Sequence, residues 1–239
     1  MSIISLDSVC KSFGALTVAD AITFEVREGE ALGIIGPNGA GKSTLFNLIT
    51  GNIAADSGTV HFLGEDVTRQ SAMQRCLNGI GRSFQIPQPF GKLTVFENLL
   101  VAGSFGQGKS ERAVEQAAAD ILDRTGLIGR ANTVADSLSF LERKRLELAR
   151  ALATAPRLLL LDEIAGGLTE GECSQLVGTI KDIHATGTTI IWIEHVLHAL
   201  TSVVERLLVL DFGKVVAVGE PADIMARPQV REIYLGIEV

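Results

Sequence analysis

The chain has 239 residues, a length that suits one large domain or two closely joined subdomains. Hydrophobic residues make up 46% of the chain, enough for a sizeable core, and the net charge of −7 argues against a nonspecific nucleic-acid binder and against adhesion to an anionic membrane. No apolar run approaches the roughly 18 residues that a membrane-spanning helix needs. Cys10, Cys76 and Cys173 have no metal-ligand spacing, so we expect reduced thiols.

Short apolar runs alternate with turn residues in the first part of the chain. This pattern predicts strands over residues 3–9, 21–26, 31–35 and 58–62, and the first of them are expected to pair antiparallel. The N-terminus has neither the basic start nor the long apolar core of a secretory signal. We therefore expect a strand-rich unit at the start of the chain.

The pattern becomes helical from residue 95 to about residue 153, where Ala- and Glu-rich stretches occur. Within this block, the segment GSFGQGKS at 103–110 is expected to be a flexible connection. A strand, a helix, a strand and a helix then follow in alternation, over residues 157–161, 170–184, 188–193 and 195–201. Such alternation is typical of a parallel α/β sheet. The sequence thus predicts an α/β core that a helical block interrupts.

A glycine-rich segment, GPNGAGKST, joins the apolar run at 31–35 to a helical pattern and fits G-x-x-x-x-G-K-[ST], the phosphate-binding P-loop. Glycines let backbone N–H groups curl round phosphates, the lysine supplies a positive charge, and the serine hydroxyl can ligate Mg²⁺. The alternative is an ordinary glycine-rich turn. The predicted nucleotide-binding residues here are Gly36, Pro37, Asn38, Gly39, Ala40, Gly41, Lys42, Ser43 and Thr44.

Two carboxylates end the apolar segment LLLLDE at 158–163. Asp162 is expected to hold Mg²⁺, and Glu163 is placed to polarise a water molecule for attack on a γ-phosphate. A strand that ends in Asp-Glu is common by itself, and it indicates this chemistry only together with the P-loop. The chain has no Asn-Lys-x-Asp element, which argues against a GTPase.

Ser139 and Glu142 have the S-x-x-E spacing of a capping box, just before an apolar-periodic run. A capped helix N-terminus favours anions, because its N–H groups and its dipole both attract negative charge. Three basic residues follow one turn later, at 143–145. From these residues alone, both an ordinary surface helix and a phosphate site stay open.

The P-loop, the serine-capped helix and the Asp-Glu strand, in this order, resemble the ATP-binding subunit of an ABC transporter over essentially the whole chain. This resemblance implies an α/β fold with a P-loop NTPase core, an N-terminal antiparallel β subdomain and an inserted α-helical subdomain. It implies one ABC ATPase domain over 1–239, in which 1–85 and 156–239 form the nucleotide-binding core and 86–155 form the helical subdomain. ATP and Mg²⁺ are the implied cofactors, and ATP hydrolysis coupled to transport is the implied activity.

The resemblance also gives functions to residues that are uninformative alone. Phe13 falls where the family stacks an aromatic ring on adenine, although a lone phenylalanine is more often a core residue. Gln85 matches the Q-loop glutamine that links the Mg²⁺ site to the membrane partner, and His195 matches the switch histidine at the γ-phosphate, although by itself it could be a helix cap. The implied catalytic residues are Lys42, Gln85, Glu163 and His195, and the implied metal-site residues are Ser43, Gln85 and Asp162.

Residues 138–142 correspond to the family's signature, LSGGQ. In the family, this helix end meets the ATP held by a second ATPase subunit, in a head-to-tail dimer. The implied contacts to that nucleotide come from Ser139, Leu141 and Glu142.

This sequence departs from the family pattern in the signature and near the Asp-Glu pair. A leucine in the signature can crowd the partner's phosphate, because a glycine there allows close backbone approach. The helical N–H groups and the capping box survive the change, so activity is expected to be retained. Phe140 and Leu141 stand where glycines are usual, Ile164 replaces a proline, and Thr169 replaces an aspartate.

Two segments are similar to the branched-chain amino acid uptake group: IGRSFQIPQPFGKLTVFENLLVA, and the C-terminal segment ending in Tyr234, Leu235 and Gly236. This implies transmembrane permease subunits and a second ATPase, identical or different, as partners, with a periplasmic solute-binding protein as an indirect one and no nucleic acid. It places the chain peripherally at the cytoplasmic face of the inner membrane. Related systems import urea, amides or aromatic acids, so the sequence leaves the solute open. A groove lined by Pro87, Pro89 and Phe90 is expected to receive a permease helix.

Two other functions stay open. A soluble ABC ATPase of translation or repair usually carries two ATPase units or a long coiled-coil insertion, neither of which fits into 239 residues. A weakly hydrolysing subunit that pairs with a more active ATPase is kept open by Leu141.

Overall fold

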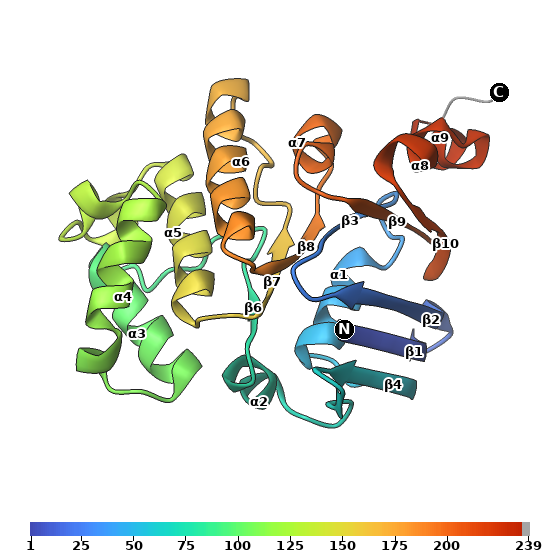
Figure 1. Cartoon of the computed structure of the whole chain (residues 1–239), viewed down its shortest axis with the longest axis horizontal. Helices are drawn as coiled ribbons and strands as arrows, with labels where there is room; N and C mark the ends of the chain where they lie inside the picture. Colours follow the sequence, from blue (N-terminus) through green and yellow to red (C-terminus); the bar gives the residue numbers. More distant parts are fainter. Residues whose placement is uncertain (236–239) are drawn as a thin grey trace.

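The computed structural model describes residues 1–235, with side chains up to residue 232, and in this part of the chain a six-stranded sheet forms the centre of the molecule (Figure 1). Its strands run parallel except for the last one, β10, which is antiparallel to β9. Strands buried on both faces are expected to read as nearly continuous apolar runs, and every residue of β3, β7 and β8 is buried. The order across the sheet is β10 (Lys214–Gly219), β9 (Arg206–Asp211), β3 (Ala31–Ile35), β8 (Thr189–Ile193), β7 (Leu158–Asp162) and β6 (Ile80–Arg82).

A second, antiparallel sheet contains the N-terminal strands, drawn in blue in Figure 1. Strands β1 (Ser2–Phe13) and β2 (Leu16–Arg27) pair from Ser2 opposite Arg27 to Phe13 opposite Leu16. The strands predicted at 3–9 and 21–26 are therefore parts of one long hairpin. Strands β4 (Ser57–Phe62) and β5 (Glu65–Asp66) extend the sheet on the other side of β1.

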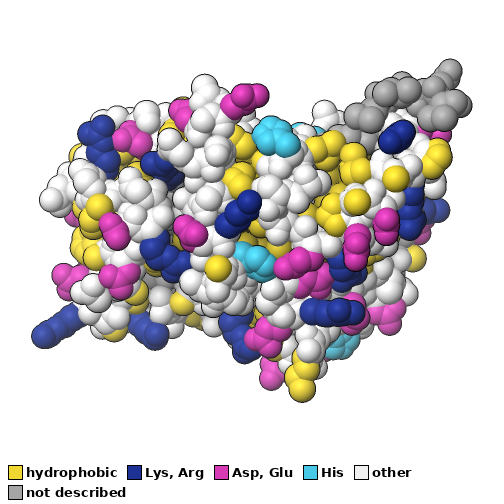
Figure 2. Space-filling view, turned by 45° about the horizontal axis from the view of Figure 1, so that its top comes forward, with side chains coloured by type: hydrophobic (Ala, Val, Ile, Leu, Met, Phe, Trp, Pro, Cys, Tyr) yellow, Lys and Arg dark blue, Asp and Glu magenta, His cyan; other side chains and the backbone are white. Residues whose placement is uncertain are grey.

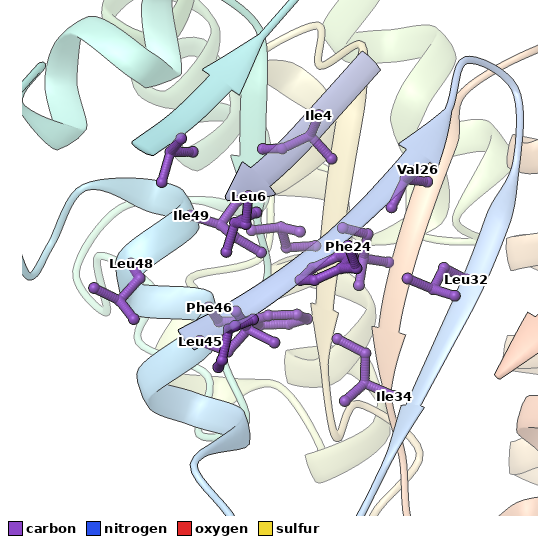
Figure 3. Packing of buried hydrophobic residues seen from close by; sticks show 14 of the residues in the cluster. Ile4, Leu6, Phe24, Val26, Leu32, Ile34, Leu45, Phe46, Leu48 and Ile49 are labelled. Atoms are coloured by element: carbon purple, nitrogen blue, oxygen red, sulfur yellow. The ribbon is translucent and has the colours of Figure 1, made fainter. Parts of the chain in front are cut away.

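Helix α1 (Lys42–Thr50) lies between the two sheets and shares one apolar core with both (Figure 3). Leu45, Phe46 and Ile49 of the helix pack with the residues of β1, β2 and β3 that face it. Apolar side chains dominate the buried faces of all three layers, so their burial supplies the main driving force for this packing. The P-loop helix is consequently fixed on both sides.

The other face of the central sheet is covered by helices. Helix α6 (Glu170–Ala185) buries Leu176 and Ile180 in the same cluster as Trp192 of β8. Helices α7 (Leu197–Thr201), α8 (Pro221–Ala226) and α9 (Pro228–Leu235) complete this layer. On the face shown in Figure 2, side chains of both charges intermix, as is typical of a solvated surface.

Three helices with their own apolar cluster form the block at the left of Figure 1: α3 (Val95–Gln107), α4 (Glu111–Arg124) and α5 (Phe140–Ala153). Two 3₁₀ turns, η1 (Ile128–Arg130) and η2 (Ala135–Ser137), connect α4 to α5, and the short helix α2 (Ala72–Leu77) precedes β6. Among residues 1–235, no helix is long and apolar enough to cross a membrane. The division of the chain at residues 85 and 156 remains a prediction.

Two local predictions were wrong. Residues 103–107 belong to α3 and are not a flexible connection, because Gly103 and Gly106 lie where the helix packs closely against its neighbours. A Cβ atom at Gly106 would lie 2.6 Å from Cγ2 of Thr154, so glycine here permits a helix contact. The helix predicted at 195–201 begins at Leu197, because the residues before it turn the chain at the end of β8.

Replacing Gly106 by Ala is expected to lower the free energy of unfolding by about 1–3 kcal/mol, as overpacking does, because Thr154 contributes both side-chain and backbone atoms to the contact. Gly178→Ala is the matched control, since Gly178 lies inside α6 with no atom within 4 Å of the added methyl group. There the change should stabilise by about 0.5–1 kcal/mol, the helix propensity difference. Urea unfolding of both variants measures this, and equal effects would contradict the close contact.

Candidate nucleotide-binding site

The P-loop leaves the carboxyl end of β3 and enters α1, so its shape depends on both elements. Gly41 precedes the helix with a φ of 101°, and a Cβ atom there would lie 2.5 Å from the Val18 carbonyl oxygen. A Cβ atom at Gly36 would collide with the Leu210 carbonyl oxygen. Side chains are excluded at both positions, so the loop keeps a backbone-lined cradle at the N-terminus of α1, where an anion is favoured.

The Lys42 ammonium group lies inside this cradle. It is buried and donates hydrogen bonds to the carbonyl oxygens of Gly36 at 2.7 Å and Pro37 at 3.0 Å. Burial lowers the pKa of Lys42, while Glu163 and Asp162 oppose that shift. A cation that is partly desolvated and hydrogen-bonded to neutral carbonyls is well suited to pair with a phosphate.

Glu163 follows β7 in a strained conformation. Its φ of 47° lies in the left-handed region, which is costly for a residue other than glycine. Its N–H donates to the Ile193 carbonyl oxygen at 2.9 Å, and its carbonyl oxygen accepts from the Lys144 Nζ at 3.3 Å. The backbone on both sides of the residue is therefore held in this conformation.

The Glu163 carboxylate brings together two residues from distant parts of the chain. Gln85 Nε2 donates to Oε2 at 2.5 Å, and His195 Nε2 lies 2.9 Å from Oε1. A cavity of about 430 Å³ adjoins this group and is lined by Glu163, Gln85, residues 38–44 and two residues of β2. His195 lines a neighbouring hollow with Gly36, Pro37 and Asn38. The predicted catalytic residues thus meet around the P-loop.

The residues of the cavity include two hydrophobic ones that the sequence did not indicate, Leu16 and Val18. Phe13 itself is 51% exposed, pairs with Leu16 across the hairpin and has the Lys11 Nζ 5.5 Å from its ring centroid, but it does not line the cavity. Hairpin pairing could have suggested Leu16, because it lies directly opposite Phe13.

The capping box at the start of α5 is confirmed. Ser139 Oγ accepts from the Glu142 N–H at 3.3 Å, and Glu142 Oε2 accepts from the Ser139 N–H at 2.9 Å. Neither of these residues nor Leu141 lines the cavity beside the P-loop. The neighbouring Phe140 is exposed, lies beside Gly167 and has the Lys144 ammonium over its ring at 5.5 Å.

Two buried charged residues that the sequence did not single out support the site. The Arg82 guanidinium donates to Asp162 Oδ2 at 2.7 Å and to Asn47 Oδ1 at 2.6 Å, between the rings of Phe46 and Phe84. It thereby ties β7 to α1. A lone arginine three residues before Gln85 carries no local signal for this contact.

The second of these residues is Glu194, at the end of β8. Its carboxylate accepts hydrogen bonds from the N–H groups of Ala165, His195 and Val196, and burial raises its pKa. It fixes the segment after Glu163 to the backbone of His195. The sequence analysis assigned a function to the adjacent His195, whereas it did not single out Glu194, which follows the strand predicted at 188–193.

The donor set fits Mg²⁺, a hard cation that prefers oxygen ligands and keeps several waters. Ser43 and Gln85 line the cavity beside the P-loop, and Asp162, which pairs with Arg82, opposes the lowering of the Lys42 pKa. Their side-chain oxygens are the candidate ligands. In the part of the chain that the structure describes, no cluster of three or more His, Cys, Asp or Glu residues could hold a metal by itself.

Arg82→Met is expected to lower the free energy of unfolding by about 3–5 kcal/mol, because it leaves a buried carboxylate unpaired; the side chains of Arg82 and Asp162 are 8% and 7% exposed. The matched control is Arg157→Met, whose pair with Glu28 is 53% and 50% exposed. That change should cost less than about 1 kcal/mol. Chemical denaturation measures both values, and similar losses would contradict a structural ion pair at Asp162.

The chain matches the family model described as ABC transporter over residues 19–166. It is 34% identical to the probable branched-chain amino acid transport ATP-binding protein LivG of Methanocaldococcus jannaschii, with 99% of this chain and 98% of the relative covered. It is 31% identical to the lipopolysaccharide export system ATP-binding protein LptB of Haemophilus influenzae, with the same coverage. A crystal structure of an ABC transporter's ATP-binding cassette in its ADP conformation covers 99% of this chain and 100% of that one, with a TM-score of 0.90 at 33% identity. The chain therefore belongs to the ABC transporter family, as one of its ATP-hydrolysing cassettes.

Proposed function

We propose that this cassette drives an importer for branched-chain amino acids or related small polar solutes. Relatives named for branched-chain amino acid transport match it at 34% identity over nearly its full length, and the segment after Gly79 supports the same group. The C-terminal segment Tyr234–Gly236, which also supports it, lies outside the residues whose side chains are described. The relative named for lipopolysaccharide export matches at the lower identity of 31%.

The meeting of Lys42, Gln85 and Glu163 around one cavity is the observation that carries the ATPase mechanism. The P-loop N–H groups and Lys42 bind the phosphates. Ser43, Asp162 and Gln85 would hold Mg²⁺, which neutralises charge on the phosphates when it is bound. Glu163 then acts as the general base that takes a proton from the attacking water, and Gln85 and His195 orient its carboxylate.

The start of α5 has a proposed task in a head-to-tail dimer. Its capped N-terminus offers N–H groups to the nucleotide of a second ATPase subunit, identical or different. A weakly hydrolysing pairing is the second candidate, because Leu141 stands at a glycine position and the exposed ring of Phe140 lies beside it. Under either candidate the chain's own P-loop is intact.

A groove of about 510 Å³ separates α2 from the helical block. Exposed hydrophobic side chains of Phe84, Phe90, Phe105 and Met73 line it, which is unusual unless a partner covers them. The expected Phe90 is among the lining residues, whereas Pro87 and Pro89 are half-buried outside it. We propose that a permease helix occupies this groove, so that the chain is held peripherally at the cytoplasmic face of the inner membrane, and that a periplasmic solute-binding protein meets only the permease.

Two substitutions test nucleotide binding and hydrolysis separately. Lys42→Ala removes a charge-assisted phosphate contact, so ATP affinity should fall by about 1.5–3 kcal/mol. Glu163→Gln removes the base but keeps the shape, so hydrolysis should slow while ATP still binds. Binding of a fluorescent ATP analogue and phosphate release measure the two effects; unchanged affinity in Lys42→Ala would refute the phosphate cradle.

The Glu163→Gln variant also tests the dimer, because bound ATP should trap the closed pair. Size-exclusion chromatography with and without ATP should detect an ATP-dependent dimer, alone or with the second ATPase of the same gene cluster, that Ser139→Arg abolishes. A dimer that forms only after Leu141→Gly would instead favour the weakly hydrolysing candidate.

Cysteine crosslinking tests the groove. In a background without Cys10, Cys76 and Cys173, Phe90→Cys and Phe105→Cys should crosslink to the permeases encoded beside this gene, because both positions line the groove. Glu115→Cys, on the exposed face of α4, is the control that should not react. Equal labelling of all three positions would rule out docking in this groove.

A further inference from the structure

Side chains of helix α5 are hydrogen-bonded to the loop that carries Gln85. Three polar side chains of the helix, Lys144, Glu147 and Arg150, recur at intervals of three residues and so point to one side. All three make hydrogen bonds to the backbone of residues 84–88. The apolar residues of the same helix pack on α3.

Glu147 contacts both ends of the loop. Its Oε1 accepts from the Phe84 N–H at 3.3 Å, and its Oε2 accepts from the Gln88 N–H at 3.4 Å. Arg150 completes the contact by donating from one nitrogen, Nη1, to the Gln88 carbonyl oxygen at 2.7 Å and to Glu147 Oε2 at 3.0 Å. The carboxylate therefore sets the separation of the two loop ends, between which Gln85 lies.

Lys144 contacts the same loop at Gln85. Its Nζ donates to the Gln85 carbonyl oxygen at 2.7 Å and to the Glu163 carbonyl oxygen at 3.3 Å. One helix thus contacts the backbones of the two residues whose side chains meet at 2.5 Å.

Burying a charged carboxylate at this position costs free energy. Glu147 is 4% exposed, and burial raises its pKa although Arg150 and the two amides oppose the shift. A well-packed hydrophobic residue in place of a buried ion pair is often equally stable or more so. The carboxylate is nevertheless suited to the loop, because Phe84 and Gln88 lie outside any strand and their N–H groups need acceptors.

We propose that Glu147 is a positioning residue for Gln85: it holds the loop at both ends so that the Gln85 amide stays on Glu163 and at the metal site. This inference rests on the proposed function, in which Gln85 contributes to Mg²⁺ binding. Glu147 and Arg150 also line the proposed docking groove. An occupant of that groove therefore contacts the same two side chains that fix Gln85.

The test uses Glu147→Gln, because the glutamine amide has one acceptor oxygen and leaves one of the two loop N–H groups without a partner. In the nucleotide-free protein, hydrogen exchange of the amides at 84–88 should become about tenfold faster or more, and the Mg²⁺ concentration for half-maximal ATPase should rise about threefold to tenfold, the effect of one lost hydrogen bond. The matched control is Glu172→Gln, which alters the capping carboxylate of α6, bonded to Thr169 and not to the loop at 84–88, and should change neither quantity.

A double-mutant comparison separates positioning from general destabilisation. Gln85→Ala should raise the Mg²⁺ requirement by itself, and Glu147→Gln should add nothing in the Gln85→Ala background, because it acts through Gln85. A purely structural Glu147 would lower the melting temperature and the active fraction without moving the Mg²⁺ requirement. If Glu147→Gln does not fold, Gln88→Pro is the alternative. It removes the Gln88 N–H that donates to Glu147 Oε2 and should also raise the Mg²⁺ requirement.

The outcomes distinguish this inference from the function on which it rests. An unchanged Mg²⁺ requirement in Gln85→Ala would remove Gln85 from the metal site, and would overturn both this inference and the metal-binding role given to Gln85 in the proposed function. A raised requirement in Gln85→Ala, with Glu147→Gln behaving like Glu172→Gln or adding its full effect in the double variant, would overturn the positioning by Glu147 alone. Faster exchange at 84–88 together with a shift that disappears in the double variant supports it.

Discussion

The packing of α1 between two sheets is the constraint on which the nucleotide site depends. Its N-terminus carries the P-loop, so any tilt of the helix would move the phosphate cradle. Leu45, Phe46 and Ile49 hold it from both sides, and at its C-terminal end the buried Arg75 guanidinium donates to the carbonyl oxygens of Leu48 and Ile49. That cation complements the negative end of the helix dipole. The cradle is thus anchored by the packing of the helix behind it.

Helix α5 has the corresponding position for the loop that carries Gln85. Its apolar face belongs to the helical block, its first turn is the capped N-terminus at Ser139, and its polar side contacts Gln85 and Glu163 through Lys144. A rotation of this block would displace the loop at 84–88 and the helix end together. The contacts proposed for the groove, the metal site and a second subunit thus all involve this one secondary-structure element.

Several features were available from the sequence because they depend on local pattern alone. The buried strands read as apolar runs, the P-loop required glycines at fixed spacing, and the S-x-x-E pair predicted the cap of α5, which the structure contains. Local pattern gave a wrong prediction where a glycine is needed for close packing. Gly103 and Gly106 looked like a flexible segment, yet both lie within a helix at close contacts that only a small residue permits.

The sequence by itself determined the fold class, the phosphate-binding loop and the carboxylates at the end of β7, because each follows from neighbouring residues. Only the tertiary structure decided which distant side chains meet them. Arg82 pairs with Asp162 across 80 positions, and Glu147 reaches the loop 59 residues away, with nothing near either residue to mark the contact. The physical reason is that a buried charge must find a partner, and the partner is set by how strands and helices pack, not by the order of residues along the chain.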